Sequence, residues 1–546
     1  MKRIVLFSLF LAGIALAIAG MLLWGNALTL KGTVIWPLTY RNYEFRNEPT
    51  PGLDQPAPQI GAMPALKQFT MPTLLAKVPP LKRGAVKTVD MHGNIGFDKF
   101  TENRRHAEFS ALQKRERPQA VEIVSGVYDM DSLYKALNDE AVLARKGSDY
   151  LLRLPLYVGP DATLVVGGKD NGKRTTLRLS SQTGAFLLNG GKMFVLHTDV
   201  RAWDDDKNRP ALFENDRKFR PFITTWSNSE TYFGQSGFYD LGYHASKSYG
   251  ISFSSLKPLL KKDPHTPAPR GWIIDSRFER LFYGFYSYEA EHVNIVNNVY
   301  ADNIIYGIDP HDRSKYLLIA GNTAYGTQKK HGIIVSREVN DSWIVNNYAH
   351  DNHGSGFMLD RTSVRNLVAG NVAFRNGNDG LTLFESGDNV IVDNKFILNG
   401  RSGLRVRNSS NVIAERNLYL LNKSNGAQVY SFDITKTESE RDFELDPFTP
   451  HTTLTIKDSW FIFNRGAMYK FNDIDLLRIS GTHFTWYEPR MVRGDFEKMT
   501  YEIAVAMRYD PRYIEIRKTR ELDPALMGSE IRNVVENDDD EDDESE

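Results

Sequence analysis

The chain of 546 residues is 41% hydrophobic and 12% aromatic, which is enough for a long core and excludes wholesale disorder. It has no cysteine, which excludes disulfides, cysteine nucleophiles and cysteine-based zinc sites. The formal net charge is −1, and removing the nine acidic residues of the final segment 536–546 takes it to +8. A mildly basic body suits an anionic polymer and equally fits a near-neutral domain with a solvated tail, and no nucleic-acid motif accompanies it.

The N-terminus has the pattern of an export signal. Lys2 and Arg3 precede an apolar run over residues 4–24, which contains small residues suited to a signal peptidase. The run also has the length of a membrane span. We therefore expect residues 1–28 to be a signal peptide or a membrane anchor, and the body of the protein to be exported.

The next segments change character in chain order. Residues 29–120 are rich in proline and show no clear periodicity, so they are interpreted as an extended lead-in. Residues 130–139 have helical spacing and are expected to cap the first layer of the domain that follows. Residues 150–200 alternate between apolar and polar side chains, which predicts short strands.

An internal repeat follows, with the pattern N-x-x-x-x-N-x-x-x-G-apolar. Its glycines are 23 to 25 residues apart, at Gly307, Gly332, Gly356, Gly380, Gly403 and Gly426. The first asparagine column is Asn298, Asn322, Asn347, Asn371, Asn394 and Asn417. The second column, five residues on, is Asn303, Thr327, Asn352, Asn376, Asn399 and Asn422.

This repeat predicts an all-β fold, a right-handed parallel β-helix. Apolar residues alternate after each glycine, as in a strand with one buried face, and a unit of this size buries that face only by stacking on its neighbours. The asparagines are expected to form a structural ladder at turns and to tolerate left-handed backbone angles, and the glycines to supply positive φ. Leucine-rich repeats have a similar period, but their helix-forming segment is missing here.

The β-helix is expected to span residues 121–490 as the catalytic domain. Residues 491–535 are predicted to form a C-terminal cap, including a helix over the open end of the solenoid, where strand edges would otherwise be unpaired. The acidic tail 536–546 is expected to be disordered and has no assigned role.

Outward-facing residues at equivalent positions of successive coils line a surface groove suited to an extended polymer. The coil 307–314 breaks the repeat, because it puts Pro310 into the strand and surrounds it with charge, and local irregularity in a regular array indicates function. A solvated loop at the coil edge is the alternative. The charged outward positions on this and the following coils are Asp309, His311, Asp312, Arg337, Asp360, Arg361, Glu385, Arg405 and Arg407.

The hexapeptide Asp309-Pro-His-Asp-Arg-Ser314, set in this repeat behind an export signal, resembles the periplasmic mannuronan C5-epimerases of alginate biosynthesis. The segment YGISFSSLKP near residue 250 extends the likeness. The resemblance implies that His311 is the base that removes the C5 proton, and that an arginine one coil later, here Arg337, binds the sugar carboxylate. It also implies a periplasmic location, polymannuronate as substrate, and a scaffold role in a complex that exports alginate.

The chemistry agrees with these residue types. A guanidinium neutralises the uronate carboxylate and stabilises the developing enolate, and a positioned imidazole accepts the proton. The acid that returns a proton to the opposite face is either water or Tyr306. Further contacts with the substrate, each of which also fits a stabilising ion pair, are expected from Tyr306, Asp309, Asp312, Arg313, Asp360, Arg361, Arg405 and Arg407.

We expect neither a metal nor a cofactor. Residues 167–174 nearly match a phosphate-binding loop, but Arg174 replaces the hydroxyl residue and a strand-like segment follows where a helix is required. His331, His350 and His353 lack a supporting carboxylate motif for a metal, and the positive neighbours of Asp309 and Asp312 argue against calcium.

Two other functions compete with epimerisation. A polysaccharide lyase shares proton abstraction at C5 and differs only in expelling the C4 oxygen, so residue types alone do not separate the two. A non-catalytic protein that binds glycans or assembles an export machinery is the second alternative, because a fold alone does not certify activity.

Overall fold

The computed structural model describes residues 37–48, 56–101, 105–168, 174–226, 228–256, 267–438, 441–444, 446–484, 491–509 and 513–519. The expected export signal and the acidic tail 536–546 lie outside these ranges. By its contacts the chain divides into unit 1, residues 1–59 with 378–546, and unit 2, residues 60–377. None of the helices within the described ranges is both long and apolar enough to cross a membrane.

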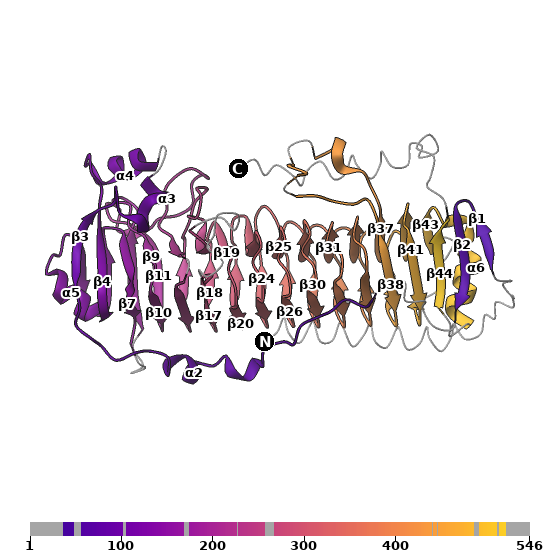
Figure 1. Ribbon diagram of the computed structural model, residues 1–546, viewed down its shortest axis with the longest axis horizontal. Coiled ribbons are helices and arrows are strands. Elements are labelled where there is room, and N and C mark those ends of the chain that lie inside the picture. Colours follow the sequence, from indigo (N-terminus) through magenta and orange to yellow (C-terminus); the bar gives the residue numbers. More distant parts are fainter. Residues whose placement is uncertain are drawn as a thin grey trace. The chain divides into compact units, whose positions relative to one another are not determined.

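From residue 187 onwards, each coil of unit 2 consists of three short strands, as the alternation of apolar residues predicts. One coil contains β22 (Tyr306–His311), β23 (Leu318–Ala320) and β24 (Thr323–Tyr325). Each of these strands pairs in parallel with its equivalent in the next coil. The strands therefore form three parallel sheets around an apolar core, and Figure 1 shows them side by side along the unit.

The three sheets are named here by number. Sheet 1 contains β9 (Leu187–Asn189), β13 (Ile223–Thr225), β16 (Gly250–Ser254), β19 (Tyr283–Tyr288), β22, β25 (Ile333–Ser336) and β28 (Phe357–Asp360). Sheet 2 contains β10 (Lys192–Leu196), β14 (Glu230–Gly234), β17 (Arg270–Ile274), β20 (Val293–Val296), β23, β26 (Trp343–Val345) and β29 (Leu367–Ala369). The long strands β4 (Gln119–Asp129) and β7 (Leu156–Val166) at the beginning of the stack belong to both sheets, since β7 pairs with β9 and with β10. Sheet 3 contains β6 (Asp149–Leu152), β8 (Thr175–Ser180), β11 (Thr198–Asp204), β15 (Gly237–Tyr239), β18 (Arg277–Glu279), β21 (Val299–Ala301), β24, β27 (Tyr348–His350) and β30 (Val372–Phe374).

The asparagine ladder predicted from the repeat is confirmed. The backbone N–H of Asn322 donates to Asn347 Oδ1 at 2.9 Å, and that of Asn347 donates to Asn371 Oδ1 at 2.9 Å. Each amide thus satisfies a backbone group of the preceding coil. The expected left-handed angles fall instead on the residue before each ladder asparagine, such as Asn346 with φ 55°.

The prediction that the repeat glycines supply positive φ is wrong, because none of them has it. They are needed because the coils stack closely. A Cβ on Gly332 would come within 2.6 Å of Asn352 Nδ2, and a Cβ on Gly403 within 2.8 Å of the Gly426 carbonyl oxygen. A side chain at either position would therefore force neighbouring coils apart.

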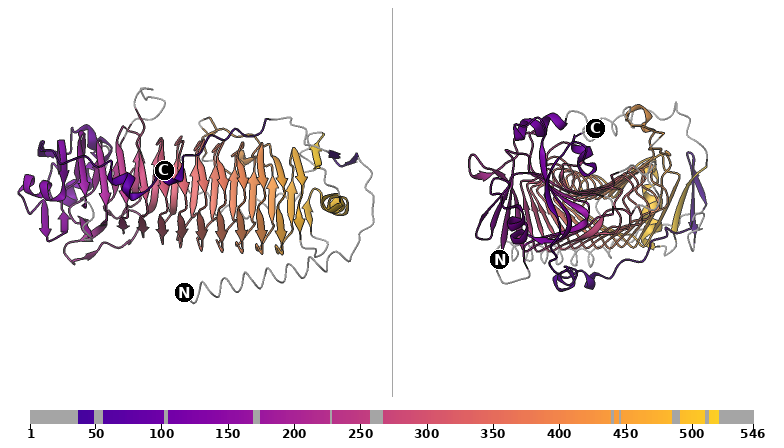
Figure 2. Two further views of the ribbon diagram at one scale, coloured as in Figure 1. Left: turned by 90° about the horizontal axis from the view of Figure 1, so that it is seen from below. Right: turned by 60° about the vertical axis from the view of Figure 1, so that its left-hand side comes forward.

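From residue 60 onwards, the described residues of the proline-rich lead-in form a folded layer of unit 2 rather than an extended segment. Its elements are η1 (Leu66–Gln68), α2 (Met71–Leu75), β3 (Val86–Asp90), η2 (Ile95–Phe97), α3 (Asp98–Thr101) and α4 (Arg105–Gln113). Apolar residues around α2 pack on the outer face of sheet 2, where the left view of Figure 2 shows this indigo segment crossing the strands. Phe97, Phe100 and Phe109 pack against Phe186 and Phe222 beside the first strands of sheet 1. Burial of these residues explains why a segment without periodicity is ordered.

The helix predicted at residues 130–139 is confirmed as α5 (Met130–Leu137). Asp129 begins it with a capping box, in which its carboxylate accepts from Ser132 N at 2.8 Å. The helix packs on β3, β4 and β7 and is followed by β5 (Leu143–Lys146), which pairs antiparallel with β6. It therefore covers strands at the beginning of the stack.

Unit 1 repeats the three-strand coil. Its first sheet contains β31 (Leu381–Phe384), β34 (Leu404–Arg407), β37 (Ala427–Tyr430), β40 (Tyr469–Asn472) and β43 (Val492–Gly494). Its second contains β32 (Val390–Val392), β35 (Val412–Glu415), β38 (Thr453–Lys457) and β41 (Leu476–Ser480). Its third contains β33 (Lys395–Ile397), β36 (Leu418–Leu420), β39 (Trp460–Ile462) and β42 (His483–Phe484), and η4 (Ile434–Lys436) lies between β37 and β38.

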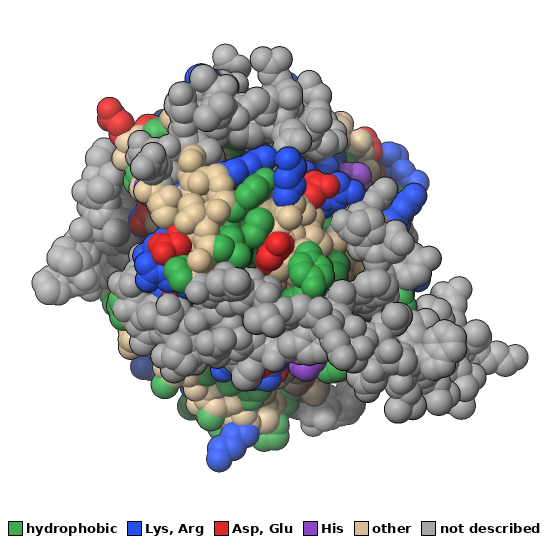
Figure 3. Space-filling model, turned by 90° about the vertical axis from the view of Figure 1, so that its right-hand side faces the viewer, with side chains coloured by type: hydrophobic (Ala, Val, Ile, Leu, Met, Phe, Trp, Pro, Cys, Tyr) green, Lys and Arg blue, Asp and Glu red, His purple; other side chains and the backbone are tan. Residues whose placement is uncertain are grey.

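The end of unit 1 is closed by antiparallel strands. β44 (Tyr513–Lys518) pairs with β41, β2 (Tyr43–Glu48) pairs with β44, and β1 (Leu38–Tyr40) pairs with β2. The predicted C-terminal helix exists as α6 (Thr500–Tyr509), preceded by η5 (Glu497–Met499), but the antiparallel strands pair with the edge that it was expected to cover. Figure 3 looks onto this end, where apolar, basic and acidic side chains share the described surface, as on a solvated cap.

Candidate active site

The irregular coil lies in sheet 1, where β22 ends at His311. In register, His311 lies between Tyr288 of β19 and Ser336 of β25, and Asp360 of β28 follows Ser336. Pro310 has no N–H to donate, and β22 pairs with β25 at Ile308 and His311, on either side of the proline. The proline therefore interrupts the ladder directly beside the imidazole.

His311 is held by the residue that follows it. Its Nδ1 lies 2.6 Å from Asp312 Oδ2, and both side chains are 12% exposed. Burial by itself would raise the pKa of Asp312, but His311, Arg337 and Lys247 lower this pKa to about 2. The carboxylate is thus ionised at neutral pH and accepts the Nδ1 proton, so that Nε2 is the nitrogen that carries the basic lone pair.

Arg337 is the neighbour of Asp312 in the next coil. The backbone N–H of Asp312 donates to Ser336 O at 3.1 Å, and that of Arg313 donates to Arg337 O at 2.8 Å. Arg337 Nη1 is 3.9 Å from Asp312 Oδ1, beyond hydrogen-bond distance. Its Nε is buried without a hydrogen-bond partner among the described residues. The imidazole, the carboxylate and the guanidinium therefore meet on one face, with donors of the guanidinium still available. His311, Asp312 and Arg337 are together called the His311 group.

Two tyrosines and a lysine that the sequence pattern did not predict lie around His311. The Tyr286 ring stacks on His311 at 5.9 Å between centroids, and Lys247 Nζ lies 3.5 Å from the centroid of Tyr288. Burial lowers the pKa of Lys247 to about 8, against the opposing effect of Asp312. A signal for both tyrosines existed: Gly284 extends the glycine column one coil upstream, and they follow it by two and four residues.

The remaining predicted residues of unit 2 have partners within the protein. Arg313 donates to the buried Glu289 at 3.2 Å and to the Tyr288 hydroxyl at 3.3 Å. Ser336 Oγ donates to Asp360 Oδ2 at 3.1 Å, and Arg361 Nε lies 3.5 Å from the same oxygen. Their contacts with a substrate remain predictions.

Tyr306 and Asp309 are both buried, at 3% and 1% exposure. Asp309 is the register neighbour of Tyr286, close to the His311 group. Tyr306 begins β22 and His311 ends it, so five residues of extended chain, roughly 16 Å, separate their backbones. The Tyr306 ring stacks instead on His331 at 5.9 Å.

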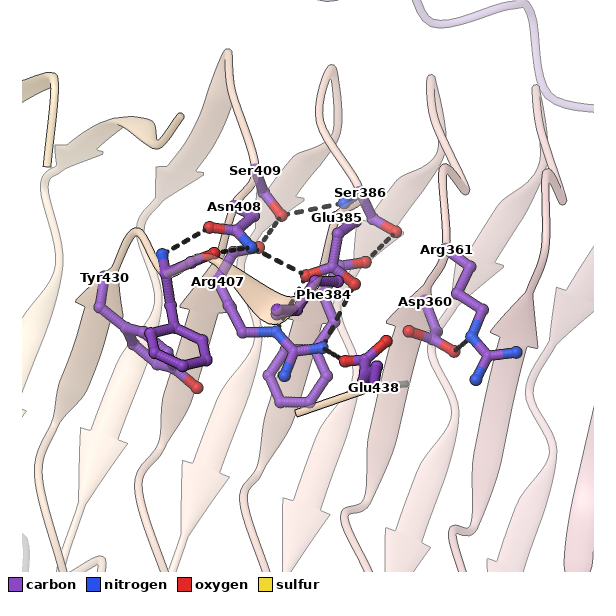
Figure 4. Close-up of polar contacts among 12 residues, drawn as sticks. Asp360, Arg361, Phe384, Glu385, Ser386, Arg407, Asn408, Ser409, Tyr430 and Glu438 are labelled. Atoms are coloured by element: carbon purple, nitrogen blue, oxygen red, sulfur yellow. Dashed lines mark hydrogen bonds and ion pairs between the residues drawn. The ribbon is translucent and has the colours of Figure 1, made fainter. Parts of the chain in front are cut away.

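Arg405 and Arg407 belong to unit 1, where both guanidinium groups are buried in ion pairs. Arg405 Nε lies 3.0 Å from Asp379. Arg407 donates to Glu385 at 2.9 Å and to Glu438 at 2.7 Å, as Figure 4 shows. Their predicted contacts with sugar carboxylates stay predictions, since in this structure the carboxylates of the protein occupy them.

The Arg407 network fixes the long connection between β37 and β38. Arg441 of this connection is 2% exposed and lies 3.0 Å from Glu385 and 3.1 Å from Glu438. The Arg407 guanidinium also lies 3.8 Å from the centroid of Phe384. Two arginines and two glutamates thus neutralise one another in a buried site, which attaches the connection to β34.

Replacing Arg407 with alanine is expected to lower the free energy of unfolding by about 3 to 5 kcal/mol, because two glutamates lose a buried partner. Arg416 offers a matched control, since its pair with Asp393 is 49% and 55% exposed. Its replacement by alanine should cost less than about 1 kcal/mol. Urea unfolding followed by circular dichroism measures both, and equal losses would contradict the structural role of the Arg407 network.

The described residues contain no group of three or more His, Asp or Glu side chains arranged to hold a metal ion. An imidazole that acts as a base through Nε2, a carboxylate that orients it and a guanidinium one coil away suit proton transfer at a carbon next to a carboxylate.

Comparisons with known proteins bear on the fold and on the family of the chain. A family model described as a right handed beta helix region matches residues 273–439. A mannuronan C5-epimerase of Pseudomonas putida is 43% identical over 350 residues, which cover 64% of this chain and just under two thirds, 66%, of that protein. The mannuronan C5-epimerase AlgG of Azotobacter vinelandii is 39% identical over 394 residues, which cover 72% of this chain and 74% of that protein.

Among solved structures, a crystal structure of the periplasmic alginate epimerase AlgG matches with a TM-score of 0.72 and 36% identity, covering 78% of this chain and 99% of that one. The predicted fold, a right-handed parallel β-helix, is thereby confirmed. The identity, the coverage and the shared fold lead to one conclusion: the chain belongs to the mannuronan C5-epimerase AlgG family.

Proposed function

We propose that this protein is an isomerase that converts β-D-mannuronate to α-L-guluronate within polymannuronate by inverting C5. The observation that carries the proposal is the group of His311, Asp312 and Arg337 on one face of sheet 1. Membership in the family supports the substrate and the reaction.

The reaction begins at the sugar carboxylate. The C5 proton is weakly acidic because an ionised carboxylate resists further negative charge. The donors of the Arg337 guanidinium bind this carboxylate and stabilise the enolate that forms as the C5–H electron pair moves into the C5–C6 bond. His311 Nε2 accepts the proton and becomes an imidazolium, which the Asp312 carboxylate stabilises.

A second proton must reach C5 from the opposite face. We assign this step to water, because Tyr306 lies at the far end of β22. The new C–H bond forms with the electron pair of the enolate, and the glycosidic bond stays intact. His311 then returns its proton to solvent.

The test is incubation of the purified protein with polymannuronate, followed by proton NMR and ultraviolet absorbance. The expected result is guluronate signals without unsaturated product. New absorbance without guluronate would identify a lyase, and neither signal would favour a non-catalytic glycan-binding protein.

Replacing Asp312 with asparagine is expected to slow epimerisation by about 10² to 10⁴, because the amide no longer stabilises the imidazolium or selects its tautomer. The variant should also lose stability in a defined pH window. The folded pKa of about 2 lies below the ordinary value of 3.8, so the ionised carboxylate stabilises the fold above pH 3.8 and loses this effect as pH falls towards 2.

The difference in unfolding free energy between wild type and Asp312→Asn is therefore expected to be about 2 kcal/mol at pH 6 and roughly half of that at pH 3. Urea titrations at the two pH values measure it. A difference that does not change with pH would contradict the assignment of an ionised, buried Asp312.

We further propose that the protein acts in the periplasm as part of a complex that exports alginate. The export signal pattern at residues 1–28 and the periplasmic AlgG neighbour support the location. Cell fractionation tests it, and crosslinking in cells that make alginate tests the complex. A cytoplasmic pool or the absence of crosslinked partners would count against the respective part.

A further inference from the structure

A cavity of about 570 Å³ opens on sheet 3 of unit 2, outside the His311 group. Its walls come from two hairpin turns and the strand between them. The first turn joins β5 to β6, and the second joins β11 to β12 (Arg209–Pro210), which pair antiparallel. The lining residues are Lys146, Gly147, Ser148, Asp149, Arg178, Trp203 and Asn208.

The cavity exists because the first coils depart from the regular unit. From β15 to β30 every strand of sheet 3 has three residues, whereas β11 has seven. The extension carries Trp203 and ends in the second hairpin turn. The extension pairs with the six-residue β8, where Trp203 is the register partner of Ser180, and the six later coils have no equivalent of it. A departure of this kind in a regular array indicates function.

The floor of the cavity is an aromatic ring backed by a cation. The Arg178 guanidinium lies 4.5 Å from the centroid of the partly exposed Trp203 ring. Arg178 also donates to Asp149 Oδ2 at 3.1 Å, which fixes its position over the indole. The Trp203 ring is thus held in place before any ligand arrives, which lowers the entropy cost of binding.

The rim carries groups that are free to bind. Lys146 is exposed and makes no ion pair with any described residue, and Asn208 is exposed at the opposite turn. With Arg178 and Asp149 neutralising each other, the ammonium of Lys146 gives the cavity a net charge of +1. A cavity of this size is in the range of small-ligand sites.

This set of groups fits an acidic pyranose. The apolar face of a sugar ring stacks on an indole, ring hydroxyls bond to amide and hydroxyl groups such as those of Asn208 and Ser148, and a carboxylate pairs with an ammonium. We propose that this cavity, here called the Trp203 pocket, is a second binding site for uronate residues of the polymer, separate from the His311 group.

The inference rests on the proposed function for its choice of ligand. The two sites share no residue and lie on different sheets, so occupation of one does not block the other. Occupation of the Trp203 pocket retains a long polymer near the enzyme between turnovers. Short oligomers gain nothing from this retention, because they leave the protein once they leave the His311 group.

The test compares the full-length wild type with Lys146→Glu and Trp203→Ala. Lys146→Glu reverses an exposed charge and is expected to fold normally, and Lys395→Glu makes the same change at an exposed position of β33 as a control. Calorimetric titration with short oligomannuronates should give two sites per chain in the wild type and the control, and one in both pocket variants.

Kinetics provide the second measurement. Both pocket variants should raise KM for long polymannuronate by about tenfold, with kcat and the KM for short oligomers unchanged. Unchanged stoichiometry together with unchanged KM for long polymer would overturn the inference while leaving the proposed function intact.

Failure of the proposed function would give a different result from failure of the pocket. If the wild type neither binds nor epimerises mannuronate, the proposed function fails, and the same titration with oligogalacturonate then tests the pocket. Binding of oligogalacturonate that Lys146→Glu abolishes would uphold an acidic-sugar site, and equal or absent binding would overturn it.

Discussion

Replacing His311 with glutamine is expected to reduce epimerisation of polymannuronate by about 10² to 10⁴, the usual contribution of a positioned base. Glutamine has a similar size but does not accept a proton at neutral pH. The polymer should still bind, because Arg337 and the rest of the face remain. Proton NMR of guluronate formation and calorimetric binding measure the two effects separately.

His350 offers a matched control for this substitution. Its Nδ1 lies 2.7 Å from Asp351, and its ring stacks on Tyr325 at 5.0 Å, so its local chemistry repeats that of His311. It belongs to sheet 3, however, away from Arg337. His350→Gln should keep full activity, and a His311→Gln variant as active as the wild type would refute the proposed mechanism.

Removing the guanidinium of Arg337 is the second change with a large expected effect. Arg337→Ala should lower kcat by about 10² to 10³, because the enolate loses the donors that stabilise its charge. Arg337→Lys should recover only part of this loss, since an ammonium restores the charge but not the paired donors. Single-turnover rates on polymannuronate separate this effect on chemistry from an effect on binding.

Arg365 is a suitable control for Arg337. Its side chain is 40% exposed, and its Nε and Nη2 donate to the Asp341 carboxylate at 2.7 and 2.8 Å. Arg365→Ala should leave kcat unchanged. If Arg337→Ala raised only KM and left kcat intact, Arg337 would bind the substrate without stabilising the enolate.

The repeat could be predicted from the sequence because every coil needs the same residue types at the same positions. Each coil needs an amide at the same turn, as in the ladder from Asn322 to Asn371, and alternating apolar residues in each strand. These features recur every 23 to 25 residues, so their spacing predicts the parallel β-helix. The role of the glycines was not readable, because it depends on how closely a neighbouring coil approaches.

The folded structure of the lead-in could not be predicted from the sequence either. Its prolines indicate extended chain, but Phe97, Phe100 and Phe109 are ordered by packing on residues about 80 to 120 positions later, such as Phe186 and Phe222. No local pattern encodes such a contact. Arg405 and Arg407 likewise occupy outward positions in sequence, yet acidic residues of unit 1 pair with both, and for Arg407 one of these is Glu438 in a distant connection.

The sequence by itself determined the coil period, the strand that carries His311 and the step of one coil to Arg337, because a solenoid converts sequence spacing directly into spatial distance. Only the tertiary structure decided that Asp312 joins the two, that Tyr286 and Lys247 complete their surroundings, and that the Tyr306 ring stacks on His331. The physical reason is that the direction, burial and pairing of a side chain depend on the neighbours that stacking brings together. The spacing of residues along the chain does not predict these neighbours.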